Sequence, residues 1–171
     1  MPFSQTLLPE FEEEMKNTRR MLERVPDGKF EYSPHTKSMN LAQLASHVAE
    51  VPTWVPYMIA QDEFDMPSDF KPDVVSTRAE LLEMFDKGVV QAREHLVKCS
   101  DEKWQQNWTF KVDGKPVMQM PRAAVVRSMI MNHMIHHRAQ LSVYLRLNDV
   151  AVPGMYGPSA DEAQTLKAQA A

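Results

Sequence analysis

Two histidines four residues apart are the feature of this sequence best suited to chemistry. His133 and His137 lie in the stretch NHMIHHRAQLSVYLR, where apolar residues recur at helical spacing. Side chains four residues apart leave the same face of a helix one turn apart, so the two imidazoles should point the same way. Two such nitrogens are half of a metal site, and the third ligand must come from elsewhere in the chain.

A third histidine, His47, is the natural candidate for that ligand. It lies in a second amphipathic segment, LAQLASHVAEV, on the side that should face a core. Buried histidines without partners are costly, whereas a divalent metal ion satisfies one ring nitrogen on each of them. The sequence therefore predicts a metal site made of His47, His133 and His137. Three neutral histidines are typical of catalytic zinc sites, and nickel, iron or manganese are the alternatives.

Two common metal motifs do not match these positions. A ferritin-like di-iron site needs a glutamate three residues before a ligand histidine, and the chain has Leu44, Ile130 and Met134 there. The HExxH motif of zinc proteases needs a glutamate directly after the first histidine, and Met134 follows His133. Both sequence patterns are therefore excluded.

Other reactive side chains have more ordinary interpretations. Cys99 is expected to be a buried or incidental thiol. Glu50 either orients His47 or faces water, and water is favoured. Arg138 and Arg146 either hold an anionic co-substrate or form surface ion pairs, the commoner role of a helical arginine. The remaining histidines are expected to lie outside the metal site; they are His35, His95 and His136, the last pointing about 100° away from His137 on an ideal helix.

Composition predicts a single domain over residues 1–171. A chain of 171 residues with 43% hydrophobic and 25% charged residues is long enough to bury a core. The net charge of −4 argues against nucleic-acid binding, which needs a basic face. The single cysteine excludes an internal disulfide. No signal peptide or long apolar span is evident, so we expect a cytoplasmic protein that does not enter the membrane.

Four helical segments are expected to position the histidines. Apolar residues recur at steps of three and four in the ranges 3–25, 40–58, 77–99 and 121–147. Capping-box patterns begin the second helix, at Asn40 and Gln43, and the third, at Thr77 and Glu80. The segment from Asp62 to Ser76 reads as a loop. These segments indicate an all-α fold, a four-helix bundle with the three histidines in its interior.

Two local breaks interrupt this pattern. Pro52 and Pro56 should kink or break the second helix just after His47, which can open a pocket. Trp54 and Tyr57 fall at the break, where they either line a substrate cavity or simply pack, and packing is favoured. Between the third and fourth helices, apolar and polar residues alternate around the pair Asp113-Gly114, which indicates a small β-hairpin.

Three motifs, in this order, resemble those of the DinB family of bacterial damage-inducible metalloproteins: SMNLAQLASHVAEV, NHMIHHRAQLSVYLR and VPGMYGPSADE. The resemblance covers nearly the whole chain, with Ala139 standing where related sequences have glycine. It implies an up-down-down-up four-helix bundle, commonly dimeric. It also implies a divalent metal ion held by three histidines, which fall on His47, His133 and His137 in this sequence.

The resemblance also carries a functional expectation. Similar members of the wider superfamily use low-molecular-weight thiols as co-substrates, so it favours a metal-dependent thiol S-transferase that acts on a small electrophile. A metal-dependent hydrolase and a non-catalytic, stress-induced protein that binds metal or a ligand remain open. A homodimer is expected, also because Trp104, Trp108 and Phe110 exceed what a four-helix core obviously uses.

Overall fold

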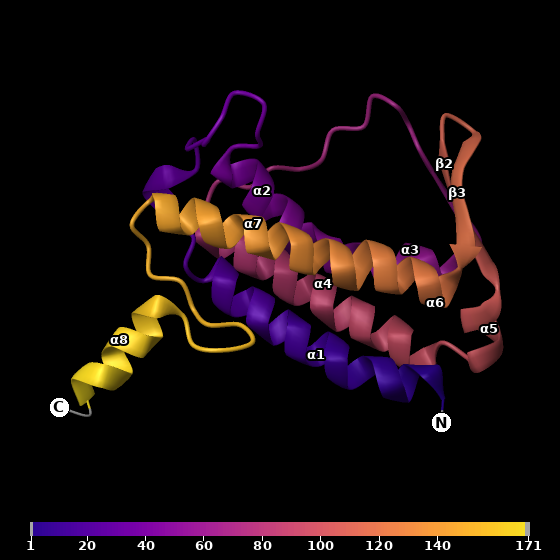
Figure 1. The fold of residues 1–171 in the computed structure, drawn as a ribbon. Helices are drawn as coiled ribbons and strands as arrows, with labels where there is room; N and C mark the ends of the chain where they lie inside the picture. Colours follow the sequence, from indigo (N-terminus) through magenta and orange to yellow (C-terminus); the bar gives the residue numbers. More distant parts are fainter. Residues whose placement is uncertain (1, 170–171) are drawn as a thin grey trace.

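Helices dominate the computed structural model, which describes residues 2–169 (Figure 1). The α-helices are α1 (Phe3–Leu22), α2 (Leu41–Glu50), α3 (Val55–Ala60), α4 (Arg78–Lys98), α5 (Asp101–Gln105), α6 (Arg122–Val125), α7 (His133–Leu147) and α8 (Ala160–Gln169). Two short 3₁₀ helices, η1 (Asp27–Lys29) and η2 (Val51–Trp54), and one π-helix, η3 (Val126–Asn132), connect some of them. The strands are β1 (Glu63–Met66), β2 (Asn107–Val112) and β3 (Lys115–Pro121).

The predicted helix starts at Asn40 and Thr77 are confirmed. The Asn40 side chain accepts a hydrogen bond from the Gln43 backbone N–H, and the Gln43 side chain accepts one from the Asn40 N–H, both at 2.9 Å. Thr77 and Glu80 form the same reciprocal arrangement at the start of α4. Each capping box satisfies backbone N–H groups that would otherwise be unpaired at a helix start.

The predicted break after His47 is also confirmed. The α-helical pattern of α2 ends at Glu50, and the chain continues as η2 and then α3. Pro52 and Pro56 lie at early positions of η2 and α3 respectively, where a missing N–H costs nothing. The regular α-helix is thus interrupted just past the histidine, although the chain remains helical.

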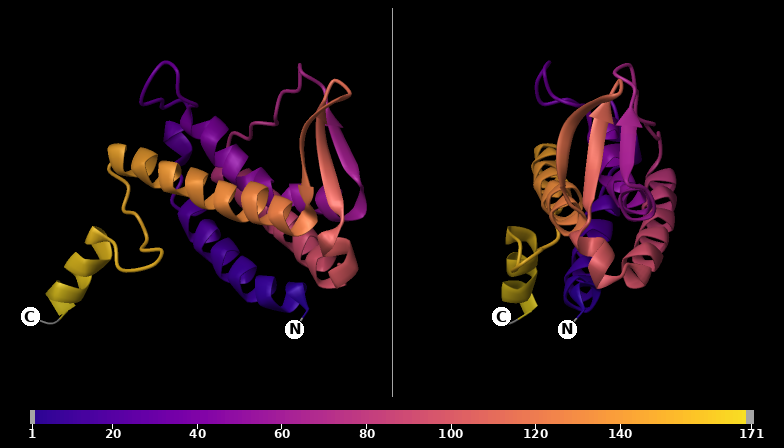
Figure 2. Two further views of the ribbon diagram at one scale, coloured as in Figure 1. Left: turned by 45° about the vertical axis from the view of Figure 1, so that its right-hand side comes forward. Right: turned by 90° about the vertical axis from the view of Figure 1, so that its right-hand side faces the viewer.

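The core lies between four of the helices. Helix α4 packs against α1 and α2, and α7 packs against the same two helices. Figure 1 shows α1 and α4 running side by side, and the left view of Figure 2 shows α7 lying across α2. Fully or almost fully buried side chains fill the space between them; among the largest are Phe11, Leu44, Phe85 and Leu141.

The all-α, four-helix prediction was wrong because the chain also builds a three-stranded mixed sheet. Its order is β1-β2-β3, with β1 parallel to β2 and β2 antiparallel to β3. The β2-β3 hairpin was predicted, and its turn residues Asp113 and Gly114 have φ of 48° and 73°, as a type I′ turn requires. Strand β1 lies in the segment that was expected to be a loop. Its partner strand is more than forty residues away in sequence, so no pattern of neighbouring residues predicts the pairing.

The fold also differs from a simple four-helix bundle by its additional helices: the short helices α3, α5 and α6, which neighbour the strands along the chain, and α8. Both figures show α8 projecting away from the other helices, while its first turn is joined to α1 and α7 by the ion pairs Arg20–Glu162 and Arg146–Asp161. Within residues 2–169, no helix has the length and apolar character needed to cross a membrane.

Two tryptophans expected at a partner surface belong instead to the interior of the chain. Trp104 is 0% exposed and donates its indole N–H to Ser4 Oγ at 2.9 Å, while Trp108 is 2% exposed. Helix α5, which carries Trp104, and strand β2, which carries Trp108, add to the core formed by the four long helices. Both indole rings are buried in this additional interior.

A buried arginine attaches the sheet to the helices. Arg122 is 0% exposed and donates hydrogen bonds to the carbonyl oxygens of Met58 (2.9 Å), Gln61 (2.7 Å) and Asn107 (3.2 Å). It also pairs with the Asp62 carboxylate. One guanidinium therefore holds the end of α3, the approach to β1 and the start of β2 together, since its donors point in several fixed directions.

Candidate metal centre

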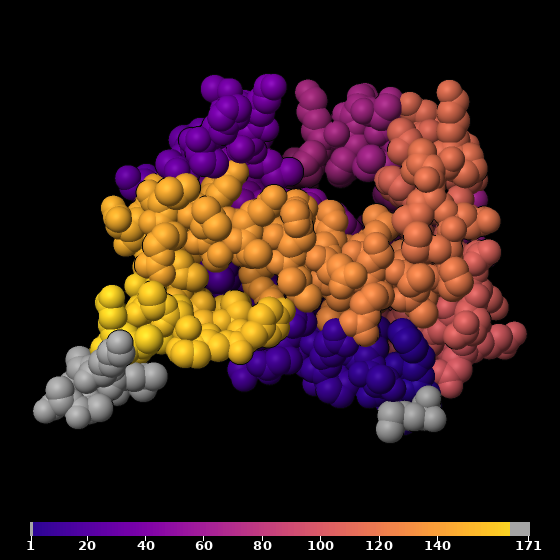
Figure 3. Space-filling model, viewed as in Figure 1, coloured from indigo at the N-terminus to yellow at the C-terminus, as the bar shows by residue number. Residues whose placement is uncertain are grey.

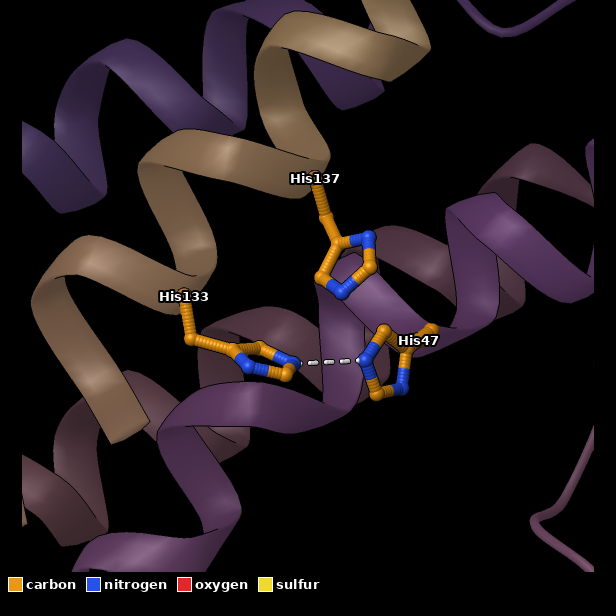
Figure 4. Close-up of side chains that lie close together, drawn as sticks. All are labelled: His47, His133 and His137. Carbon is orange, nitrogen blue, oxygen red and sulfur yellow. Dashed lines mark hydrogen bonds between the residues drawn. The ribbon is translucent and has the colours of Figure 1, made fainter. Parts of the chain in front are cut away.

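The three predicted histidines converge on one point between α2 and α7 (Figure 4). His47 comes from α2, and His133 and His137 come from α7, one helical turn apart. The Nε2 atoms of His47 and His133 are 2.8 Å apart, and one ring nitrogen from each of the three histidines lies within 4.8 Å of the others. Among the described residues this is the group of His, Cys, Asp and Glu side chains that is positioned to hold a metal ion.

The local structure before His133 is unusual. The π-helix Val126–Asn132 ends at the residue preceding this histidine. Such helices are rare and frequently accompany functional sites, because the extra residue in a turn changes the direction of the side chains that follow. The π segment thus helps to set the direction from which His133 and His137 face α2.

The far ring nitrogen of two histidines is fixed by a hydrogen bond. His47 Nδ1 lies 2.9 Å from Glu50 Oε1, and His137 Nδ1 lies 2.8 Å from Gln140 Oε1. Both partners are acceptors, so each Nδ1 carries the proton and each Nε2 lone pair is left for a metal ion. Sequence analysis favoured water as the surroundings of Glu50, which was wrong. It did not identify Gln140, although both residues follow their histidine at the i+3 spacing that brings helical side chains together.

Burial keeps the α7 histidines neutral. Burial first, and then the neighbouring imidazoles of His137, His47 and His136, lower the pKa of His133 to about 4. Burial likewise lowers the pKa of His137, against the opposing effect of its hydrogen bond to Gln140. Both rings are therefore neutral at neutral pH, with one ring nitrogen free of a proton, which is the state that ligates metals.

The geometry fits a divalent ion after a small adjustment. A tetrahedral zinc ion with Zn–N bonds of about 2.0–2.1 Å separates its ligand nitrogens by roughly 3.3 Å. The 2.8 Å approach of His47 Nε2 to His133 Nε2 would therefore widen by about half an ångström. Rotation of the rings within the group can supply this change, because all three side chains are only partly buried.

A cavity of about 360 Å³ is lined by Glu50 and Trp54, which also contact His47. Trp54 and Tyr57 lie in its wall, whereas sequence analysis favoured simple packing for both. The Trp54 ring centroid lies 5.5 Å from those of His47 and His133, so this indole borders both the cavity and the histidine group.

The remaining sequence candidates lie outside the group. His136 is exposed and touches His137 only ring to ring, with centroids 4.8 Å apart. His35 and His95 are exposed as well. Cys99 is buried, and burial raises the pKa of its thiol, which agrees with the expected unreactive role.

Neither arginine singled out in the sequence is available to an anionic co-substrate. Arg138 is 2% exposed and pairs with Glu14 Oε2 at 2.6 Å, so the expected surface role was wrong. Arg146 forms a two-pronged pair with Asp161 at 3.0 and 2.6 Å, which is the surface ion pair that was favoured.

Removal of the Glu50 carboxylate should weaken metal binding without abolishing it. Partners that orient a ligand histidine typically contribute 10–100-fold to metal affinity, so we expect Glu50→Ala to raise the zinc dissociation constant by roughly that factor. Glu50→Gln keeps an acceptor oxygen and should lose less. Competition with a chromophoric chelator measures both. Unchanged affinity in Glu50→Ala would show that the carboxylate does not orient His47.

Comparisons with known proteins agree with this architecture. The family model described as "DinB family" matches residues 1–170. The uncharacterized protein YrdA of Bacillus subtilis is 24% identical over 157 residues, which cover 91% of this chain and 89% of YrdA. A DinB-like crystal structure from Bacillus cereus matches with a TM-score of 0.70 at 22% identity, covering 91% of this chain and 98% of that one. A second, YjoA of Bacillus subtilis, matches with a TM-score of 0.66 at 14% identity, covering 90% and 99%. The match to the family model over almost the entire length shows that the chain belongs to the DinB family.

Proposed function

We propose that His47, His133 and His137 bind one divalent metal ion and that the protein is a metal-dependent thiol S-transferase. The observation that supports this proposal is the convergence of three imidazoles beside a cavity. Catalytic zinc sites use three protein ligands and keep the remaining position for water or substrate. The donor set suits zinc, and nickel, iron or manganese are alternatives.

The chain itself would contribute positioning and shielding. When bound, a divalent ion supplies a Lewis acid that lowers the pKa of a thiol towards neutrality. Glu50 and Gln140 hold the rings of His47 and His137 in the ligating orientation. The Trp54 ring packs against His47 and His133, with centroids 5.5 Å from each, and lies between these histidines and the cavity wall.

The reaction we propose is a nucleophilic substitution. The thiol releases its proton to solvent, and the sulfur electron pair forms a bond to an electrophilic carbon. The bond from that carbon to the leaving group breaks, and the leaving group departs with the electron pair. A neighbouring general base is unnecessary because the thiol is ionised before it attacks.

The same reasoning favours a thiol over water as the nucleophile. Metal-dependent hydrolases of the HExxH type use a free carboxylate as the general base for water. The carboxylate beside the histidines here, Glu50, is already engaged with His47 Nδ1. In a hydrolase, Glu50 would therefore have to orient His47 and act as the general base for water at the same time.

A cobalt-substituted protein provides the test of thiol use. We expect 2-mercaptoethanol to change the visible spectrum, because a sulfur atom that reaches cobalt adds charge-transfer bands. The change should grow as pH rises, since only the thiolate ligates well. Ethylene glycol, which has a hydroxyl in place of the thiol, is the matched control and should have no effect. His47→Ala should abolish the response.

Two outcomes would replace the transferase proposal. Metal-dependent hydrolysis of a test ester, with no spectral response to several biological thiols, would identify a hydrolase. A protein that binds metal but shows neither response would be a metal-binding or ligand-binding protein without catalytic activity.

We also propose that the chain forms a homodimer, on the basis of the family resemblance and of exposed apolar side chains on α4. Val90 is 59% exposed and Val97 is 49% exposed. Val90 also lines a groove between α1 and α4, where Met15, Phe85 and Val89 lie among charged side chains. Sedimentation equilibrium at micromolar concentration should give about twice the chain mass of 19.6 kDa. A single species at the monomer mass would contradict it.

A further inference from the structure

The cavity lined by Glu50 and Trp54 is enclosed by segments from four parts of the chain. Its walls come from the end of α2 and the following η2 and α3, from β1 and the loop after it, from β2, and from η3. Figure 3 shows a hollow on this face of the molecule, bordered by the magenta loop, the orange hairpin and the orange helix. A volume of about 360 Å³ is near the lower end of the range for small-molecule sites, so it suits a ligand of few atoms.

Aromatic side chains dominate the wall of this cavity. They make up 8% of the chain but half of the residues that line the cavity, namely Trp54, Tyr57, Phe64, Phe70, Trp108 and Phe110. Core packing does not account for all of these rings, because Tyr57 is 46% exposed and Phe70 is 53% exposed. Large exposed rings that gather at a concave site indicate a binding surface.

Three of the rings form a group at the sheet, the sheet-side rings Tyr57, Phe64 and Phe110. Phe64 of β1 and Phe110 of β2 are direct partners in the sheet, and their rings are parallel within 3°, with centroids 6.4 Å apart. The Tyr57 ring of α3 lies 5.4 Å from the Phe64 ring. Side chains from three separate elements thus bring their π-systems to one part of the cavity wall.

The charged residues of the wall are both acidic. Glu50 and Asp73 supply carboxylates, and no lysine or arginine accompanies them among the described lining residues. The segment 62–73, which carries β1 and the loop after it, contains five carboxylates and one lysine. Negative charge attracts a cation, and the faces of aromatic rings attract it as well. The wall therefore selects against anions and favours a cation.

We propose that the cavity binds a small organic cation, whose substituted ammonium group contacts the sheet-side rings and is balanced by the Asp73 carboxylate. An inorganic cation fits this wall poorly, because Ca²⁺ and Mg²⁺ need about six oxygen ligands and rings line half of the cavity. An ammonium carrying alkyl groups instead has the apolar surface that aromatic rings contact and the charge that their faces attract.

The histidine group sets where the ammonium lies. Glu50 and Trp54 line the cavity and also contact His47, so they mark the part of the wall nearest the three imidazoles. A divalent ion there repels an ammonium group, and this repulsion falls with distance. The ammonium is therefore assigned to the sheet-side rings, and the rest of the molecule extends towards the histidines. In the thiol transfer proposed above, on which this role rests, the cation is the electrophilic substrate.

Choline and its uncharged isostere test the proposal directly. The isostere, 3,3-dimethylbutan-1-ol, has a carbon atom in place of the nitrogen and otherwise the same shape. Choline should bind roughly five- to thirtyfold more tightly, the value of cation–π contact. The anion 3,3-dimethylbutanoate should bind more weakly than either. In ¹⁵N-tryptophan-labelled protein, the indole signals of Trp54 and Trp108 should shift saturably, whereas Trp104, which is buried against Ser4 Oγ, is the internal control.

Two variants separate the contributions of the rings and of the charge. Phe70→Leu keeps an apolar side chain but removes an exposed π-face, so choline affinity should fall roughly two- to fivefold while that of the isostere stays the same. Asp73→Asn should have an effect of similar size, again on choline alone. Asp69→Asn is the matched control, because Asp69 is exposed in the same loop and is not among the lining residues. Circular dichroism checks the fold of each variant.

The titrations are run on metal-free and zinc-loaded protein, with zinc content measured on the same samples. Zinc should weaken choline binding without abolishing it; complete loss would place the ammonium at the histidines and overturn its assignment to the sheet-side rings. Equal affinity for choline and the isostere, or unmoved Trp54 and Trp108 signals, would overturn the cation site even if zinc binds. Choline binding in a protein whose cobalt form ignores thiols would support the site and overturn only its role in thiol transfer.

Discussion

Alanine at His47, His133 or His137 should each abolish stoichiometric metal binding. The unaltered protein is expected to bind about one divalent ion per chain, as one three-histidine group allows. Because a residue that merely orients a ligand contributes 10–100-fold to affinity, loss of a ligand itself should cost more than about 100-fold. Elemental analysis after dialysis against a weak chelator measures the remaining metal in each variant.

Histidines outside the group are the matched controls. His136→Ala removes an exposed imidazole adjacent to His137 on the same helix and should keep full occupancy. His35→Ala and His95→Ala should also keep it. Unchanged metal content in any of the three ligand variants would remove that residue from the site, and loss of metal from His136→Ala would assign a fourth ligand.

Arg138→Met should lower the free energy of unfolding by about 3–5 kcal/mol, the usual effect of breaking one partner of a buried ion pair. The Arg138 guanidinium pairs with Glu14 Oε2 at 2.6 Å and donates to the Glu14 carbonyl and Thr18 Oγ1, both at 3.0 Å. It also donates to Tyr156 Oη at 2.7 Å, which joins α1, α7 and the C-terminal turn. Methionine fills much of the volume, so the loss comes mainly from the Glu14 carboxylate left buried without its cation.

Denaturation in urea measures this change, provided that the slope of the transition is the same in both proteins. Arg146→Met is the control on the same helix, because the Arg146–Asp161 pair is solvent-exposed and surface pairs contribute little. A loss below about 1 kcal/mol in Arg138→Met would contradict the assignment of a buried structural ion pair. Glu14→Gln should recover part of the stability lost in Arg138→Met, since it removes the uncompensated charge.

Local interactions explain what was predicted correctly from the sequence. The i, i+4 spacing of His133 and His137 acts within one turn of helix, so periodicity alone predicts that they share a face. The Asn40 and Thr77 capping boxes and the Asp113-Gly114 turn each depend on residues at most three apart. His47 could be added to the pair because its place beside Leu44 and Val48 assigned it to a buried face.

Contacts between distant residues decided the rest. Strand β1 exists because Glu63–Met66 finds a parallel partner in β2, and so the predicted all-α bundle became a helical fold with a sheet. An arginine on a helix is expected to lie at the surface. Arg138 is buried instead because α1 packs beside α7 and supplies Glu14 as its ion-pair partner. The aromatic cavity arises in the same way, since its walls come from segments more than fifty residues apart. Such contacts depend on which segments pack together in the folded chain. The periodic pattern of one segment shows which of its faces is buried, but it does not identify the distant segment that buries that face.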